Sequence, residues 1–238
     1  MIPRAAMVLA AGRGERLRPF TDARPKPLVE VGGKALIDRA LDRLAAAGVA
    51  RAVVNASYKG AMIERHLAGR ARPEIVISRE ARRLETGGGI AKALGALGPD
   101  PFYVVNGDLL WRDRAVPALA RLATAWDDAR WDALLLLVPL AAARGYQGRG
   151  DFDRAADGRL SRRPADGDAP YVFAGVQLLH PRLFDDHPEG AFSINILYDL
   201  AIARGRLGGV VHDGDWMHVG DPAGLAAAEA WLAAAVGG

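Results

Sequence analysis

The stretch that most restricts the folds open to this chain is its first apolar run and the loop that follows. Residues 5–11 are apolar, and the run ends abruptly in small residues, Ala10, Ala11, Gly12 and Gly14. Side chains this small let backbone N–H groups come within hydrogen-bonding distance of a base or a phosphate. We therefore interpret the stretch as a first strand that opens into a nucleotide site.

Cations follow the small residues at once. Residues 1–34 hold seven Lys and Arg against three Asp and Glu, a local excess of four where the whole chain carries +3. Cations that are fixed in place stabilise the negative charge on a leaving pyrophosphate better than flexible ones. Only four lysines occur in the chain, so Lys26 stands out from the background. We expect Arg16 and Lys26 to be catalytic.

The residues from Gly12 to Lys34 resemble the signature of the sugar-nucleotidyltransferases, the pyrophosphorylases that make nucleotide sugars. The matching residues are Gly12, Gly14, Arg16, Leu17, Pro19, Thr21, Pro25, Lys26, Pro27, Leu28, Val31, Gly33 and Lys34. The resemblance implies that a nucleoside triphosphate and a sugar 1-phosphate react by in-line attack. Arg16 would neutralise the pyrophosphate, and Lys26 would hold the α-phosphate or the incoming phosphate. Nucleotide contacts are then expected from Leu9, Ala11, Gly12 and Gly14.

Apolar runs alternate with helical patterns along the chain, which predicts βαβ units. We expect a single α/β domain over residues 1–238, with a Rossmann-like, mostly parallel sheet flanked by helices. Helices are predicted over 36–47, 60–67, 90–97, 116–125, 194–203 and 222–236, and strands over 5–11, 52–55, 75–77, 102–105, 131–140, 171–179, 210–211 and 216–219. Hydrophobic residues are sparse over 141–170, so a β-hairpin or flexible flap is expected there, over the sugar site.

A glycine cluster, residues 87–89, is expected to lie between a strand and the helix that begins at Ile90. Bare backbone lets a flat ligand lie against it, although a flexible turn is the alternative. In the sugar-nucleotidyltransferases this segment lies against the nucleobase. The resemblance therefore implies base contacts from Gly87 and Gly88, with Glu85 as a further candidate.

Asn106 and Asp108 follow a hydrophobic strand, at the edge where open α/β sheets bind ligands. Mg²⁺ needs oxygen ligands and phosphates, so Asp108 is the candidate metal ligand, with a simple turn as the alternative. The resemblance implies Mg²⁺ as the cofactor. His218 replaces the second aspartate of the family, and imidazole suits Mg²⁺ poorly. Either one carboxylate suffices, or His218 reaches the metal weakly or through water, or Asp221 or Asp215 substitutes.

The sugar is predicted from the second half of the chain. Arg163 stands where many family members have lysine in a Glu-Lys-Pro motif, and it could hold a phosphate. Residues 148–152 and 173–177 look like the short branch of the family that uridylylates N-acetylmuramate 1-phosphate. Guanylyl transfer to mannose 1-phosphate and a non-catalytic nucleotide-sugar sensor are the alternatives. The implied sugar-phosphate contacts are Asn106, Gly150 and Gly175.

Composition excludes several other classes. The chain has no cysteine, which rules out disulfides and thiolate metal sites. Its basic surplus is spread along the chain without the stripe typical of nucleic-acid binders. The longest later apolar run, residues 133–140, is far below the roughly 20 residues that span a bilayer. We expect a cytoplasmic protein with no nucleic-acid, membrane or obligate protein partner. A Rossmann oxidoreductase is a more distant option, because the third glycine of its motif is missing.

Overall fold

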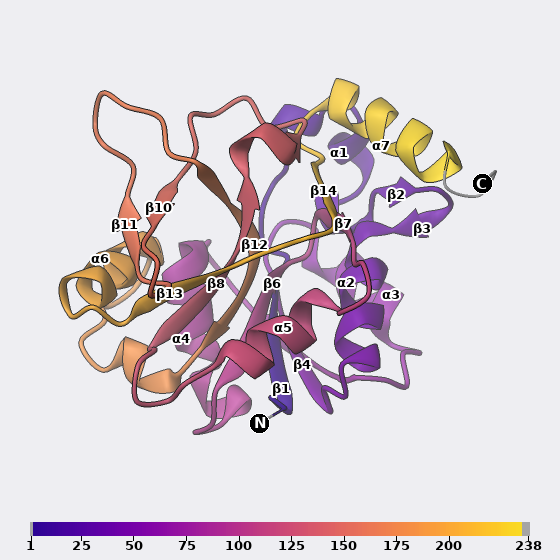
Figure 1. Ribbon diagram of the computed structural model, residues 1–238. Helices are drawn as coiled ribbons and strands as arrows, with labels where there is room; N and C mark the ends of the chain where they lie inside the picture. Colours follow the sequence, from indigo (N-terminus) through magenta and orange to yellow (C-terminus); the bar gives the residue numbers. More distant parts are fainter. Residues whose placement is uncertain (1, 235–238) are drawn as a thin grey trace.

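A computed structural model describes residues 2–234 of the chain. At its centre lies a nine-stranded sheet with the order β11-β10-β12-β6-β1-β4-β5, in which β8 pairs with both β12 and β13 (Figure 1). The strands of this sheet are β1 (Ala5–Leu9), β4 (Arg51–Ala56), β5 (Glu74–Arg79), β6 (Phe102–Asn106), β8 (Ala133–Pro139), β10 (Phe152–Arg154), β11 (Leu160–Arg162), β12 (Tyr171–Leu179) and β13 (Leu207–Val211). β6, β1, β4 and β5 are parallel, whereas β12 runs antiparallel to β6 and β8.

Helices cover both faces of this sheet. The helices on these faces are α2 (Leu36–Ala46), α3 (Gly60–Leu67), α4 (Glu85–Leu97), α5 (Ala118–Ala125) and α6 (Asn195–Ala203). In the described part of the chain, the helices α1 (Phe20–Ala23) and α7 (Pro222–Ala234) contribute no residue to the two cores on the sheet. Successive side chains of a strand point to opposite faces, so Val8 packs with α2, α3 and α5 while Met7 packs with α4 and α6. The expected Rossmann-like α/β architecture is confirmed.

A second, three-stranded sheet stands beside the central one. It consists of β7 (Leu109–Arg112), β14 (Asp215–His218) and β9 (Ala143–Arg144), and a short hairpin of β2 (Glu30–Val31) and β3 (Lys34–Ala35) lies nearby. A small separate core joins these elements to α7 and includes Leu17, Val29, Leu110, Met217 and Trp231. Helix α7, the yellow helix in Figure 1, therefore packs against the residues next in sequence to the expected site.

The structure differs from the predicted elements at a few places. Helix α4 begins at Glu85, not Ile90, so the glycine cluster forms its first turns. The hairpin expected within residues 141–170 is present as β10–β11, over residues 152–162, and it joins the edge of the central sheet beside β12. Strand β7 was not predicted. Helix α7 follows its prediction to Ala234, and the predicted residues beyond it, up to Val236, lie outside the described part of the chain. Over residues 2–234, no helix is long and apolar enough to cross a membrane.

Candidate active site

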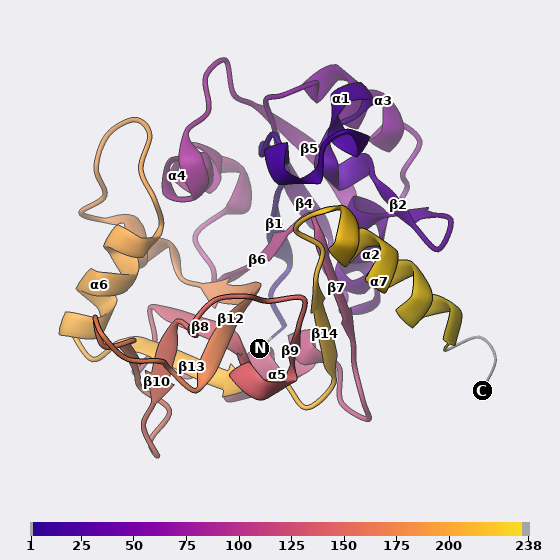
Figure 2. The same ribbon diagram turned by 90° about the horizontal axis from the view of Figure 1, so that it is seen from above.

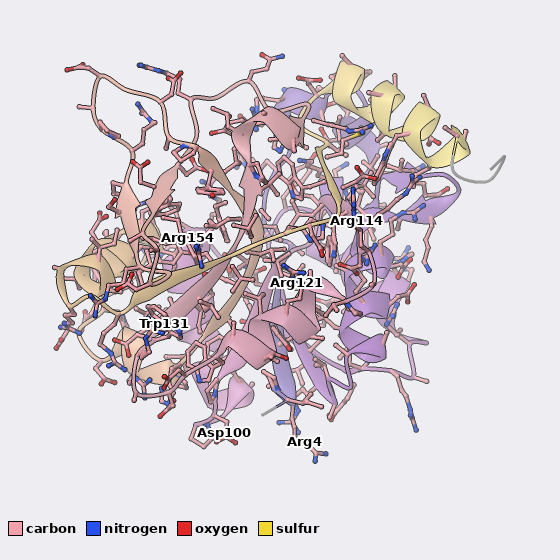
Figure 3. The ribbon with its side chains drawn as sticks, viewed as in Figure 1. Arg4, Asp100, Arg114, Arg121, Trp131 and Arg154 are labelled. Atoms are coloured by element: carbon pink, nitrogen blue, oxygen red, sulfur yellow. The ribbon has the colours of Figure 1, made fainter. Side chains whose placement is uncertain are left out.

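Two cavities lie at the carboxyl ends of β1 and β6. Figure 3 shows Arg4 and Asp100, which precede these strands, at the lower edge of the molecule, so the loops after the strands rise toward the opposite edge. The first cavity has a volume of about 580 Å³ and is lined by residues 9–16, Lys26, Pro27, Asn55, Arg83, Glu85, Thr86, Asn106, Asp108, Ser193 and Gly220. The second has a volume of about 920 Å³.

Four residues line both cavities: Arg16, Lys26, Asn106 and Asp108. They come from the loop after β1, from the segment that follows α1, and from the end of β6. The two cavities therefore meet at a cluster of two cations, an amide and a carboxylate. Molecules bound in the two cavities could therefore contact the same four side chains.

The loop after β1 packs directly on Lys26. Gly14 has a φ of +64°, and a Cβ built on it would lie 2.7 Å from Lys26 Cβ and 3.0 Å from Thr21 Cγ2. The Thr21 hydroxyl donates a hydrogen bond to the Gly14 carbonyl at 2.9 Å. Only glycine fits this position without strain. The spacing of the signature thus builds one compact unit that carries Arg16 and Lys26 together.

Lys26 and Asp108 form an ion pair across the junction. Lys26 Nζ lies 2.7 Å from Asp108 Oδ2, and the lysine side chain is only 10% exposed against 31% for the aspartate. Arg16 is exposed, and within residues 2–234 neither a hydrogen bond nor an ion pair joins it to another side chain. Its guanidinium can therefore contact an anion at the junction without first breaking a bond to the protein.

His218 lies beside Asp108 because β14 pairs with β7. His218 is opposite Leu109, the residue after Asp108, and it lines the second cavity. Burial lowers the pKa of the imidazole and the charge of Lys26 lowers it further, against an opposing effect of Asp108. Asp221 lines the same cavity, whereas Asp215 is outside it, 3.7 Å from an arginine of β9. The lowered pKa keeps the His218 imidazole neutral near pH 7.

Within the described residues, no cluster of three or more His, Cys, Asp or Glu could hold a metal ion. Mg²⁺ usually binds through one or two carboxylates together with substrate phosphates. Asp108, partly exposed at the junction with the amide of Asn106 beside it, fits this arrangement. The neutral nitrogen ligand of His218 does not suit Mg²⁺.

The second cavity contains the other expected sugar contacts. Gly175 has a φ of +76° at a bulge of β12, and a Cβ there would lie 2.8 Å from Asn106 Nδ2. Gly150 has a φ of +78°, and its Cβ would meet the Ala169 carbonyl at 2.1 Å. Both positions require glycine, and both line the cavity. Arg149 and Asp151, from the 148–152 segment that the sequence analysis singled out, line the same cavity. Sequence reasoning missed Tyr146, Asn195 and Tyr198, which also line it.

Arg162, the last residue of β11, and Arg163 after it also line the second cavity, but their guanidinium groups contact other protein groups. Arg162 Nε donates to Asp199 at 2.7 Å, and its guanidinium lies over the ring of Phe152. Arg163 Nη1 donates to the Gly167 carbonyl at 2.8 Å within its own loop. The Nη1 group thus closes its own loop, and because Arg163 still lines the second cavity, its contact with a phosphate stays a prediction.

The glycine cluster at the start of α4 is placed differently from the sequence prediction. Gly87 and Gly88 do not line the cavity, and their N–H groups donate to the Phe192 carbonyl at 2.9 and 3.2 Å. A Cβ on Gly87 would lie 2.3 Å from the Phe192 ring, so close packing explains this glycine. Figure 2 shows α4 and α6 on the same side of the molecule, with the loop that precedes α6 beside α4.

Glu85, by contrast, lines the first cavity with its backbone in the left-handed region, at a φ of +59°. Non-glycine residues in this region are uncommon and cluster at functional sites. Arg83, Thr86 and Ser193 line the same wall, and Thr86 Oγ1 accepts a hydrogen bond from the Ile194 N–H at 3.0 Å. Sequence reasoning singled out none of the three: Arg83 and Thr86 lie within two residues of Glu85, whereas Ser193 comes from a segment more than 100 residues away that no motif connects to it.

Comparison with known proteins gives a consistent result. Residues 5–234 match the family model described as nucleotidyl transferase. The chain is 48% identical to N-acetylmuramate alpha-1-phosphate uridylyltransferase of Caulobacter vibrioides, over 98% of both proteins. It is 30% identical to mannose-1-phosphate guanylyltransferase of Mycobacterium tuberculosis over 88% of this chain, but over only 56% of that protein. The fold also resembles the crystal structure of UDP-glucose pyrophosphorylase complexed with UDP-glucose, with a TM-score of 0.80, 17% identity and coverage of 98% and 99%.

Proposed function

This chain belongs to the nucleotidyl transferase family, and we propose that it transfers a uridylyl group from UTP to N-acetylmuramate 1-phosphate. The products would be the nucleotide sugar and pyrophosphate. The observation that carries the proposal is the junction of the two cavities at Arg16, Lys26, Asn106 and Asp108. The arrangement suits a nucleotide in the first cavity and a sugar phosphate in the second, with their phosphates in contact.

The proposed reaction is a direct in-line displacement. An anomeric phosphate oxygen of the sugar 1-phosphate attacks the α-phosphorus of UTP, and the bond from that phosphorus to the β-phosphate oxygen breaks. Little covalent chemistry remains for the protein, so positioning and charge neutralisation carry the rate. Lys26, nearly buried, holds the α-phosphate or the attacking phosphate, and Arg16 neutralises the pyrophosphate as it leaves.

Each of the two cavities is proposed to bind one of the two substrates. Leu9, Ala11, Gly12 and Gly14 would follow the nucleotide along the loop after β1, and Glu85 would contact the base. Asn106, Gly150 and Gly175 would contact the sugar phosphate. Two cations of the second cavity, Arg149 and Arg162, pair with Asp168 and Asp199, which lie outside its lining. The choice of N-acetylmuramate 1-phosphate therefore rests on the 48% identical relative and not on the charge of the cavity.

The donor set fits a divalent cation held between the protein and the substrates. Asp108 would provide the protein oxygen ligand, and bound Mg²⁺ would neutralise phosphate charge there. His218, kept neutral by burial and by the charge of Lys26, would shape the cavity wall without binding Mg²⁺ directly.

Pyrophosphate release with a panel of substrates tests the proposal. UTP and GTP are each combined with the 1-phosphates of N-acetylmuramate, N-acetylglucosamine and mannose, with and without Mg²⁺. We expect the highest kcat/KM for UTP with N-acetylmuramate 1-phosphate. A preference for GTP with mannose 1-phosphate would assign the chain to the guanylyltransferases instead. Binding of the substrates without turnover, with any metal, would indicate a nucleotide-sugar sensor.

A further inference from the structure

A buried chain of three hydrogen bonds connects the two walls of the first cavity. The Ala10 N–H donates to Asn55 Oδ1 at 2.7 Å, and Asn55 Nδ2 donates to Glu80 Oε1 at 2.7 Å. Glu80 Oε2 then accepts the Leu84 N–H at 3.0 Å. Ala10 belongs to the loop after β1. Leu84 directly precedes Glu85, at the end of the cavity where the base is proposed to bind (the base end). Two side chains thus join segments that are separated by more than 70 residues in the sequence.

Both side chains are shielded from water. Asn55 is 2% exposed and Glu80 is 5% exposed. A Cβ built on Gly89 would lie 2.9 Å from both Asn55 Nδ2 and Glu80 Oε1, so this glycine leaves room for the bond between them. Within residues 2–234, no Lys, Arg or His is paired with Glu80. Burying a carboxylate without a cation is costly, which makes a purely incidental role a poor explanation.

The pattern of donors and acceptors fixes which side chains can close this chain. Both ends are backbone N–H donors, at Ala10 and Leu84. An amide and a carboxylate between them satisfy all three contacts. Two amides would leave one pair of donors facing each other, and two carboxylates would leave one pair of acceptors facing each other. A buried group left unsatisfied in this way is strongly unfavourable.

We propose that Asn55 and Glu80 are positioning residues that hold the base end of the nucleotide cavity against the loop after β1. Asn55 also lines the first cavity, but its Oδ1 and Nδ2 are both engaged in the chain, with the Ala10 N–H and with Glu80. The two residues therefore act through the backbone of Ala10 and Leu84, and so set the affinity for the nucleotide rather than for the sugar phosphate. The inference rests on the proposed function in one respect, that the first cavity binds the nucleoside triphosphate.

An exchange of the two groups tests the inference. The single variants Glu80→Gln and Asn55→Asp each leave one contact mismatched, whereas the double variant N55D/E80Q restores an amide and a carboxylate in reversed order. UTP binding is measured by calorimetry, and KM is measured separately for UTP and for the sugar 1-phosphate. We expect each single variant to weaken UTP binding about tenfold or more, as the loss of one buried hydrogen bond implies. The double variant should bind UTP within about threefold of the wild type.

A matched control separates this effect from a general loss of charge. Glu64→Gln makes the same substitution in an ion pair with Arg79, outside both cavities, and should leave UTP binding unchanged. The KM for the sugar 1-phosphate should stay within about twofold in all variants, because the second cavity does not include these residues. If a single variant does not fold, the double variant still decides the question, since it should fold and bind UTP.

Single variants that bind UTP as well as the wild type would overturn the inference and leave the proposed function intact. A folded double variant no better than the single variants would also overturn it, because the hydrogen-bond pattern would then not matter. A wild-type protein that binds neither UTP nor GTP would overturn the proposed function, and the inference with it.

Discussion

Replacing Arg16 by alanine should separate catalysis from stability. The guanidinium is exposed and bonded to no other side chain of residues 2–234, so its removal should change the free energy of unfolding by less than about 0.5 kcal/mol. In the proposed reaction, the same group, at the junction of the two cavities, neutralises the leaving pyrophosphate. Loss of one preorganised charge partner lowers kcat about 10²–10³-fold, which corresponds to about 2.7–4 kcal/mol.

Arg18→Ala is the matched control for this experiment. Arg18 is also exposed and lies two residues further along, but it pairs with Asp22 at 3.3 Å and lines neither cavity. Pyrophosphate release at saturating substrates should therefore fall in Arg16→Ala and stay near the wild-type rate in Arg18→Ala. Urea unfolding of both variants checks that the fold is intact. An Arg16→Ala variant that keeps near-normal kcat would refute the role of this side chain.

Three further predictions concern the packing and charges around the site. Trp231→Ala and Trp131→Ala should each lower the free energy of unfolding by about 3–5 kcal/mol in urea. Only Trp231→Ala should also lower kcat in the folded protein, because its small core includes Leu17 and Met217, the residues next to Arg16 and His218; equal kcat values would contradict this. The buried carboxylate of Asp132 forms ion pairs with two arginines, at 2.6 and 2.8 Å. Asp132→Asn should lower the free energy of unfolding by about 3 kcal/mol and leave kcat/KM unchanged, and an unchanged urea midpoint would count against this. Burial lowers the pKa of His180 below 6.5, so the unfolded chain binds the proton more readily and the free energy of unfolding should fall as the pH drops below about 6.5. The urea midpoints of the wild type at pH 7.5 and pH 5.5 should therefore differ more than those of His180→Gln. The same difference in both proteins would refute this.

Most of the fold could be predicted from local sequence patterns. The apolar runs and amphipathic patterns placed every helix that contributes to the central layers, because burial on one face imposes a fixed period on each element. Strand β7 escaped prediction because it is short and is defined by its partner, β14, which lies about 100 residues away in the chain. Hydrogen bonding between such distant segments leaves no periodic trace in either one.

The site shows the same division between local and distant information. The signature alone brings Arg16 and Lys26 together, since Gly14 packs on Lys26 within one short stretch. The sequence predicts that the backbone of Gly87 and Gly88 contacts a base, but their N–H groups donate to the carbonyl of Phe192, which lies more than 100 residues away in the chain. Asn55 could be recognised only in three dimensions, because its hydrogen bonds reach segments on both sides of it in the chain.

The central claim is that one nucleotide and one sugar phosphate meet at the junction of the two cavities. A crystal structure of the protein with UDP-N-acetylmuramate tests it most directly. The account predicts the uracil beside Glu85 in the first cavity, the sugar beside Gly150 and Gly175 in the second, and the diphosphate within hydrogen-bonding distance of Arg16 and Lys26. A ligand bound on another surface, or with both halves in one cavity and the junction empty, would contradict it.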